Sequence, residues 1–341
     1  MSDISTRNQW KGPTIRQIAK LAGVSSASVD RVLHNRPGVK EKTRSSVLAA
    51  LEKLEHDYGK NSHILELKLF CESGDAFNQQ METAVQTANR SFPGVQLQGH
   101  FVTTSESDPM QFANLIEDGS KTADGVILIG REHPAINLAT RKLVNASVPV
   151  VCLTTDLPSS RRSAYVGNDQ YAAGSVAAQL IGQILPDRPS SILLILSEPF
   201  RSQQEREMGF RRVLRNEFQH LRIEERMISN DDPETTYEQL LAYFATHVHP
   251  AAIYNVAGAN RGVAMALEEK GIARKTVFVG HELTPYSRAL QGTGVMDYAI
   301  SHDFTYELNT ALNWIKNKLN GHVSDPAYSP ILVHTRYNCG A

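Results

Sequence analysis

The residues with the clearest chemical potential lie in the stretch TIRQIAKLAGVSSASVDRVLHN, residues 14–35. Ser25, Ser26 and Ser28 stand at the start of a short segment with helical apolar spacing, and Arg31 follows on the same segment. Hydroxyl groups bind phosphates or base edges, and an arginine can bind a guanine bidentately or contact a phosphate. The pattern therefore indicates contact with nucleic acid.

The distribution of charge supports the same interpretation. Residues 1–60 hold eleven Lys and Arg and six Asp and Glu, so their net charge is +5, whereas the rest of the 341-residue chain carries −6. A basic segment attached to an acidic body favours a polyanionic partner for that segment.

Three short helices must position these residues. Thr14 and Gln17 predict a capping box at the start of the first helix, Gly23 ends it, Ser25 caps the second, and a third begins near Lys40. Two helices joined by a tight glycine turn, with a third behind them, make a helix-turn-helix, although an ordinary helical hairpin has the same pattern. The apolar residues expected to face inward are Ile15, Ile18, Ala19, Ala22, Val29, Val32, Leu33, Val47, Leu48, Leu51 and Leu54.

Residues 14–54 resemble the N-terminal DNA-binding module of the lactose-repressor (LacI) family of bacterial transcription regulators. The Ala-Gly-Val-Ser corner and the Arg-Val-Leu ending of the second helix carry the resemblance. It implies that Ser26, Ala27 and Arg31 read bases in the major groove. The full set of DNA contacts that we expect is Thr14, Ser25, Ser26, Ala27, Ser28, Arg31 and Asn35.

Two features depart from the family pattern. Asp30 stands where a small hydroxyl residue is common, and we expect it to turn away from DNA or to pair with a basic side chain. The stretch EHDYGKNSH, residues 55–63, lacks the Ala-Arg-x-Leu hinge motif whose leucine enters the minor groove. We therefore expect a short linker here and DNA contacts that depend mainly on the helix-turn-helix.

From Ile64 onward, apolar strand patterns alternate with helical ones, which predicts parallel sheets covered by helices on both faces. The expected strands are 64–71, 95–102, 125–130, 148–155, 191–197, 221–229, 251–257, 276–282 and 294–301. The expected helices are 77–90, 109–120, 134–146, 170–185, 203–217, 234–246, 260–270 and 304–319.

This many strands exceeds one small open sheet, and the chain divides near AYVGNDQYAAG, residues 164–174. We therefore expect an α/β fold class, with two doubly wound parallel-sheet lobes sharing a cleft beyond the strands' carboxyl ends and a small all-α domain before them. The expected domains are 1–60, a helix-turn-helix domain with a short linker, and 61–341, an effector-binding domain. We expect one lobe of this domain to consist of about 64–167 together with 296–325. We expect the other to consist of about 168–295 together with 326–341.

Residues 64–341 resemble the type I periplasmic sugar-binding protein fold, through EREMGFRRVL, AIYNVAGANRGVAMALEE, VFVGHEL and the segment around residue 165. The resemblance implies that Arg206 and Glu282 grip ligand hydroxyls. His302 stands where glutamine is more common, which suggests an altered ligand or pH response. The expected effector-binding residues are Asp75, Phe77, Asn78, Asp156, Asp169, Arg206, Asn255, Glu282 and His302. The alternatives to effector contact are that Arg206 lies on a helix surface and that Phe77 lies in the core.

Other chemistries lack their motifs. Cys71, Cys152 and Cys339 are far apart, which favours inert buried thiols over a disulfide framework or a metal site. Dinucleotide, Walker, zinc-protease and nucleophile-elbow patterns are missing, so we expect no metal, no cofactor and no enzymatic activity. The polar N-terminal segment has no signal-peptide core and no apolar run reaches about 18 residues, so we expect a cytoplasmic protein without membrane contact.

The leading hypothesis is a homodimeric transcription regulator, most simply a repressor. It binds a near-palindromic operator DNA and responds to a small carbohydrate-like effector. One alternative is a cytoplasmic sugar-binding receptor whose N-terminal helices meet another protein, and another is an enzyme acting on a small polyol.

Overall fold

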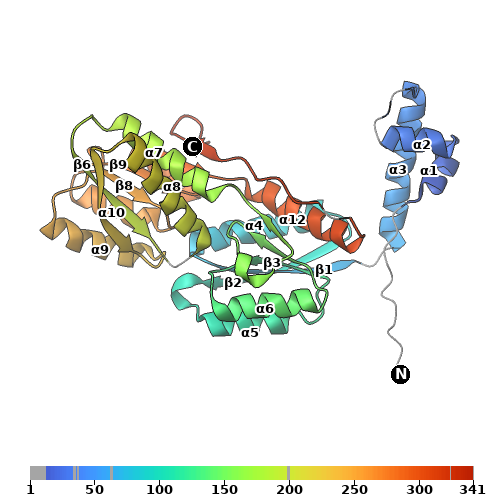
Figure 1. Ribbon diagram of the computed structural model, residues 1–341, viewed down its shortest axis with the longest axis horizontal. Coiled ribbons are helices and arrows are strands. Elements are labelled where there is room, and N and C mark those ends of the chain that lie inside the picture. Colours follow the sequence, from blue (N-terminus) through green and yellow to red (C-terminus); the bar gives the residue numbers. More distant parts are fainter. Residues whose placement is uncertain are drawn as a thin grey trace.

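The computed structural model describes residues 13–33, 36, 38–61, 64–197, 200–322 and 324–340. The N-terminal part is a helical unit of α1 (Ile15–Ala22), α2 (Ser26–Leu33) and α3 (Glu41–Asn61). Figure 1 shows α1 and α2 beside α3, at one end of the molecule and apart from the α/β body.

The predicted caps order the helical unit. The Thr14 hydroxyl accepts from the Gln17 amide at 3.3 Å, and the Gln17 side chain accepts from the Thr14 amide at 2.8 Å. Gly23 ends α1 with φ 65°, a left-handed conformation that glycine adopts at little cost. The Ser25 hydroxyl accepts from the Ser28 amide at 3.2 Å and so starts α2.

The core of this unit is narrower than the apolar pattern predicts. It consists of Ile18, Ala19, Val29, Val32, Val47 and Ala50, with Ala22, Val24, Val39, Leu51 and Leu54 packed at its edge. Ile15, Leu33 and Leu48 are exposed, contrary to expectation. Helices this short share one small contact region, so apolar residues beside that region remain in solvent.

The predicted linker is largely helical. α3 continues to Asn61, so residues 55–61 extend the third helix. The segment contains no proline and a single glycine, so nothing in it forces the helix to end. Residues 62 and 63 lie outside the described part of the chain.

The first lobe is built on a parallel sheet with the order β2-β1-β3-β4-β5. Its strands are β1 (Leu65–Ser73), β2 (Val95–Thr103), β3 (Gly125–Ile129), β4 (Val150–Leu153) and β5 (Ala164–Val166). α4 (Asp75–Ser91) and α12 (Phe304–Leu319) cover one face, and α5 (Pro109–Gly119) and α6 (Pro134–Asn145) cover the other. Short 3-10 helices, Thr104–Glu106 and Pro158–Ser160, lie in its loops.

The second lobe is built on a sheet with the order β11-β10-β9-β8-β6-β7, parallel except for antiparallel β11. Its strands are β6 (Ser190–Leu196), β7 (Leu221–Ile228), β8 (Ala252–Asn255), β9 (Val277–His281), β10 (Tyr298–Ser301) and β11 (Leu332–His334). α7 (Gln170–Ile184) and α8 (Arg201–Glu217) cover one face. The other face of the sheet carries α9 (Pro233–Thr246) and α10 (Asn260–Glu269), with α11 (Pro285–Thr293) beside β10.

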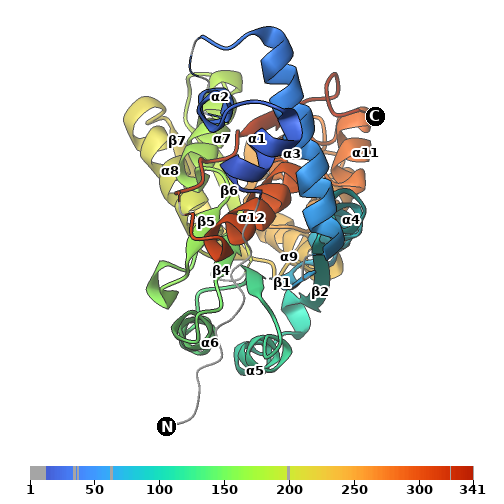
Figure 2. The same cartoon turned by 90° about the vertical axis from the view of Figure 1, so that its right-hand side faces the viewer.

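The structure confirms the predicted α/β class with two doubly wound lobes. It moves one expected boundary, because β10 pairs with β9 and β11 and so belongs to the second lobe. The chain crosses to the first lobe only after residue 301, where α12 packs against that lobe's core. The sequence pattern missed β5, β11 and α11, because each is short and has a weak apolar signal. Figure 2 shows the helical unit in front of the two lobes.

Candidate functional site

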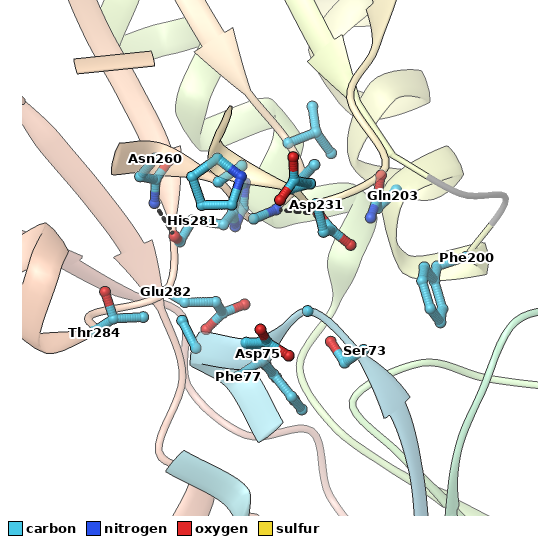
Figure 3. Close-up of a pocket in the computed structure, with 18 of the residues that line it drawn as sticks. Ser73, Asp75, Phe77, Phe200, Gln203, Asp231, Asn260, His281, Glu282 and Thr284 are labelled. Atoms are coloured by element: carbon cyan, nitrogen blue, oxygen red, sulfur yellow. Dashed lines mark hydrogen bonds between the residues drawn. The ribbon is translucent and has the colours of Figure 1, made fainter. Parts of the chain in front are cut away.

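A cavity of about 340 Å³ lies between the lobes, where the carboxyl ends of strands from both sheets meet. Its size is at the lower end of the range for small-molecule pockets. Figure 3 shows Ser73, Asp75 and Phe77 of the first lobe on one side of an open space, with Gln203 and Asp231 of the second lobe on the other. The position is the one that doubly wound sheets use for ligands.

Strained backbone is concentrated around this cavity. Thr154, Asp231, Ala259 and Glu282 all line it, and all have φ between 58° and 67°. The left-handed region is unfavourable for residues other than glycine and persists where the surrounding structure enforces it, often at functional sites.

Arg206 is the most firmly held basic group of the cavity wall. Its Nε donates to Gln170 Oε1 at 2.7 Å, Nη1 donates to the Val256 carbonyl at 3.3 Å, and Nη2 donates to Glu282 Oε1 at 3.3 Å. The guanidinium is buried in the second lobe, so the alternative of a helix-surface arginine is wrong. An arginine fixed in this way is preorganised for directional hydrogen bonds to a ligand.

Close packing of α7 and α8 sets the position of Arg206. A Cβ on Gly174 would lie 1.8 Å from the Arg206 carbonyl oxygen, and one on Gly209 would lie 2.0 Å from the Tyr171 carbonyl oxygen. Glycine at both positions lets the two backbones approach more closely than any other residue would allow.

Among the described residues of the predicted effector set, Asp75, Phe77, Arg206 and Glu282 line the cavity. Asp75 accepts from the Thr103 hydroxyl at 2.7 Å. Phe77 is half-buried and packs edge-on against Phe304, with ring centroids 5.0 Å apart, so it belongs to both the cavity wall and the edge of the core.

Other members of the set have structural partners instead. The side-chain Nδ2 of Asn78 donates to the backbone carbonyls of residues 73 and 102 at 3.2 and 3.1 Å. Asp156 pairs with Arg162 at 2.5 Å, and Asp169 caps α7 by accepting from the amide of residue 172. These polar side chains satisfy the backbone and ionic groups that irregular loops leave unpaired.

The last two predicted effector residues, Asn255 and His302, also have partners within the protein. Asn255 is fully buried and donates to the Gly258 carbonyl at 2.6 Å and to Asn260 Oδ1 at 2.8 Å. His302 is buried between two carboxylates rather than placed on the cavity wall. These side chains do not line the cavity, so their contact with an effector stays a prediction.

Sequence reasoning missed several cavity residues, among them Gln203, Asp231 and Asn260. Asp231 accepts from the Ser197 hydroxyl at 2.8 Å and from the Gly258 amide at 2.7 Å, and so joins two loops. The sequence Asn-Asp-Asp-Pro was the available signal, since its second Asp caps α9 and turns the first toward the cavity.

The lobes touch across the cavity. A Cβ on Gly74 of the first lobe would lie 3.1 Å from the Asp231 Cβ of the second. Gln80 Nε2 donates to the Leu283 carbonyl at 3.1 Å. The cleft is therefore narrow, with little room for a side chain at position 74.

Burial shifts the pKa values of His281 and Cys71. His281 and the Tyr254 hydroxyl are 2.8 Å apart, and burial, followed by Arg206 and His302, lowers the pKa of His281 well below its ordinary value. Burial, with the Glu72 carboxylate, raises the pKa of the Cys71 thiol. Cys71, Cys152 and Cys339 are free and buried, as predicted, and no cluster of potential metal ligands occurs among the described residues.

The second candidate surface is α2 with its cap residue Ser25, and it carries Arg31 in its last turn. Ser25, Ser26, Ala27 and Arg31 are exposed there, and Ser28 is half-buried. Asn35 lies outside the described residues. Asp30 pairs with Arg36, with Nη1 and Oδ2 3.2 Å apart, so the carboxylate has a basic neighbour, which is one of the two outcomes that the sequence led us to expect.

Comparison with known proteins decides the family. The profile described as Bacterial regulatory proteins, lacI family matches residues 14–60, and that described as Periplasmic binding protein domain matches residues 69–322. The chain belongs to the lacI family of bacterial regulatory proteins. This LacI-family member is thus a DNA-binding transcription regulator with a periplasmic-binding-protein domain.

A curated repressor is similar to this chain, and two solved structures share the fold of its body. The Probable HTH-type transcriptional repressor ExuR of Bacillus subtilis (strain 168) is 25% identical over 249 residues, which cover 71% of this chain and 72% of the relative. GanP, a glucose-galactose binding protein from Geobacillus stearothermophilus, has TM-score 0.73 at 20% identity, over 82% of this chain and all of that one. A solute binding protein from Burkholderia graminis C4D1M, in complex with D-arabinose, has TM-score 0.75 at 18% identity, over 81% and 97%.

Within the described ranges, no helix is both long and apolar enough to cross a bilayer.

Proposed function

We propose that this LacI-family protein is a transcription repressor that binds a palindromic operator as a homodimer and is controlled by an uncharged sugar or polyol in the cleft between its lobes. The observation that carries the proposal is the pairing of two features in one chain. An exposed, hydroxyl-rich helix start follows a helix-turn-helix corner, and a buried arginine–carboxylate pair faces a small cavity.

The charges of the cavity wall support an uncharged effector. Among the described residues, the carboxylates in the lining outnumber the guanidinium groups, and Glu282 already neutralises Arg206. An acidic sugar would bring a further negative charge into a wall where Arg206 is already paired, and it would depend on the exposed Arg261 for a cation, which is costly in a desolvated site. The lining carboxylates are Asp75, Asp231, Asp232, Glu234 and Glu282, and the lining guanidiniums are Arg206 and Arg261.

Two copies of the helical unit suit a two-fold symmetric operator. Each α2 enters the major groove of one half-site, and the half-sites lie about one helical turn, 34–36 Å, apart. Effector binding changes the angle between the lobes and so the spacing of the two units. A coupling free energy of about 1–3 kcal/mol between the two sites suffices for regulation.

The test is an electrophoretic mobility shift with the intergenic DNA beside the protein's own gene, with and without D-galactose, D-arabinose, myo-inositol and D-glucuronate. We expect a specific shift that one of the uncharged compounds changes and that glucuronate leaves unchanged. If no specific shift occurs in any ligand state, the alternative of a sugar-binding receptor acting through a protein partner is favoured.

Thermal unfolding with the same compounds tests the cleft separately from DNA binding. A ligand at a hundred times its dissociation constant stabilises the native state by about 2.7 kcal/mol. Stabilisation by glucuronate alone would contradict the choice of an uncharged effector.

A further inference from the structure

His302 lies where the chain crosses from the second lobe to the first. It follows β10 of the second sheet and precedes α12, which packs in the core of the first lobe. Its Nε2 is 3.4 Å from Glu282 Oε2, and its Nδ1 is 2.8 Å from Glu307 Oε2. Glu282 belongs to the cavity wall of the second lobe and Glu307 to the first turn of α12. The imidazole therefore bridges carboxylates from different lobes.

This bridge is part of a longer buried series of charges. Arg206 pairs with Glu282 at 3.3 Å at one end. At the other end, Glu307 accepts from the hydroxyl of Ser329 and lies 3.5 Å from the hydroxyl of Thr154. The side chains of the series are exposed by 13% or less: Arg206 6%, Glu282 13%, His302 1% and Glu307 0%.

Charge balance requires a protonated imidazole. Two carboxylates and one guanidinium leave a net negative charge in a buried site, and an uncompensated buried charge is strongly unfavourable. Burial alone would lower the pKa of His302, but Glu307 and Glu282 raise it to about 10. Burial alone would likewise raise the pKa of Glu282, but His302 and Arg206 bring it below its ordinary value.

The remaining neighbours of the imidazole do not compete with this role. The Phe304 ring from α12 packs against it, with ring centroids 4.4 Å apart. His281 from β9 has a pKa well below its ordinary value, because of burial first and then Arg206 and His302, so it stays uncharged at neutral pH. The charged groups facing His302 are thus Glu282, Glu307 and, through Glu282, Arg206.

We propose that His302 is a positioning residue that clamps Glu282 to Glu307 and thereby links the effector-facing wall to the first lobe. The inference rests on the proposed function. Glu282 has φ 67° and needs neighbours that hold it in this conformation. A ligand hydroxyl that hydrogen-bonds to Glu282 then acts on a carboxylate shared with the link between the lobes, so occupancy of the cavity biases the lobe angle. Deprotonation of His302 weakens the link.

The first experiment needs no ligand and compares the full-length chain with His302→Gln, Glu307→Gln and the control His322→Gln. His322 is exposed just beyond the other end of α12. The pKa of His302 is about 10 in the folded chain, above about 6.5 in the unfolded one, so its stabilisation is complete below 6.5 and is lost as pH rises through 10.

We expect the unfolding midpoint of the wild type and of His322→Gln to fall over this window, and His302→Gln to lack that part of the fall. Nitrogen NMR of labelled histidines at pH 8.5 should show one imidazolium that His302→Gln removes. A neutral His302 at that pH, or an unchanged pH slope in His302→Gln, would overturn the proposal.

The second experiment measures binding of D-galactose, D-arabinose and myo-inositol by calorimetry. For a probe that binds the wild type, we expect about a tenfold to hundredfold loss of affinity in His302→Gln and in Glu307→Gln, and no further loss in the double variant. Additive losses would show independent roles and overturn the link. If none of these probes binds the wild type, the proposed effector class fails, while the pH profile and NMR signal still decide the role of His302.

Discussion

The helical unit and the cleft present their polar groups in opposite ways. Ser26, Ala27 and Arg31 are all exposed on the short helix α2 and so are open to a partner. In the cleft, Arg206 and Glu282 come from different elements and are already bonded to each other. A surface that reads a large, rigid partner can be built from one local segment. A site that encloses a small molecule needs groups fixed by the fold on several sides.

Replacing the buried arginine should separate the two regions most strongly. In Arg206→Ala, Glu282 loses its guanidinium partner inside the protein, and we expect the free energy of unfolding to fall by about 3 kcal/mol. Stabilisation by a sugar should disappear, whereas DNA binding by the separate helical unit should remain. Thermal unfolding with ligand and mobility shifts without it provide the two measurements.

The control for this variant is Arg215→Ala, an exposed arginine in the last turn of the same helix. It should leave both stability and sugar response within about 0.5 kcal/mol of the wild type. If Arg206→Ala keeps its sugar response, the arginine is not part of the effector site.

The packing beneath Arg206 offers the next largest effect. In Gly174→Ala, the new methyl group would meet the Arg206 carbonyl at 1.8 Å, so α8 must shift. We expect a loss of about 1–3 kcal/mol of stability and weaker sugar binding, because the guanidinium moves with its backbone. Chemical denaturation and calorimetry measure the two effects.

Gln179→Ala, at an exposed position of α7, the helix that contains Gly174, is the matched control. It should change neither stability nor sugar affinity. Lost stability with unchanged sugar affinity in Gly174→Ala would mean that the helix contact does not position Arg206.

The sequence predicted elements whose signal is local. Most strands and helices, the capping box of α1 and the glycine end of that helix follow from residues a few positions apart. Weak local signals failed, as in α11, where polar residues fill a nine-residue helix, and in residues 55–61, which continue α3.

Cleft residues were harder to predict because a polar side chain near the end of a strand can face the cavity or can be engaged by a neighbouring group instead. Family position correctly indicated Arg206 and Glu282 as cavity residues. Asp156 follows β4 and Asn255 ends β8, but Arg162 and Asn260 engage them a few residues further along the chain. His302 differs because it also reaches Glu282 beyond a separate strand, a contact that spacing along the sequence does not reveal, whereas Glu307 lies only a few positions on, in the first turn of α12.

In the helical unit, Arg31 tests whether an exposed position is enough for base recognition. In Arg31→Ala, we expect affinity for the specific operator to fall by about 1–3 kcal/mol, with a smaller change for unrelated DNA. Titrations across a salt series distinguish a base contact from a phosphate contact, since losing one phosphate contact lowers the salt slope by about 1.

Lys53→Ala, which removes an exposed lysine of α3, controls for the loss of one positive charge. Unchanged operator affinity in Arg31→Ala would remove the assignment of α2 as the recognition helix.

The Asp30–Arg36 pair should give the smallest effect and the finest distinction between the two regions. Its side chains are 36% and 63% exposed, so solvent screens the pair, and Asp30→Asn should change stability by less than about 1 kcal/mol. The cleft pair Arg206–Glu282 is 6% and 13% exposed, so breaking it should cost several times more stability.

If the carboxylate of Asp30 serves to keep Arg36 from the DNA backbone, Asp30→Asn releases that arginine, and operator affinity should rise with a steeper salt dependence. Equal affinity and an equal salt slope in Asp30→Asn would mean that Arg36 lies too far from the phosphates to contribute, and that the pair only orders the end of α2.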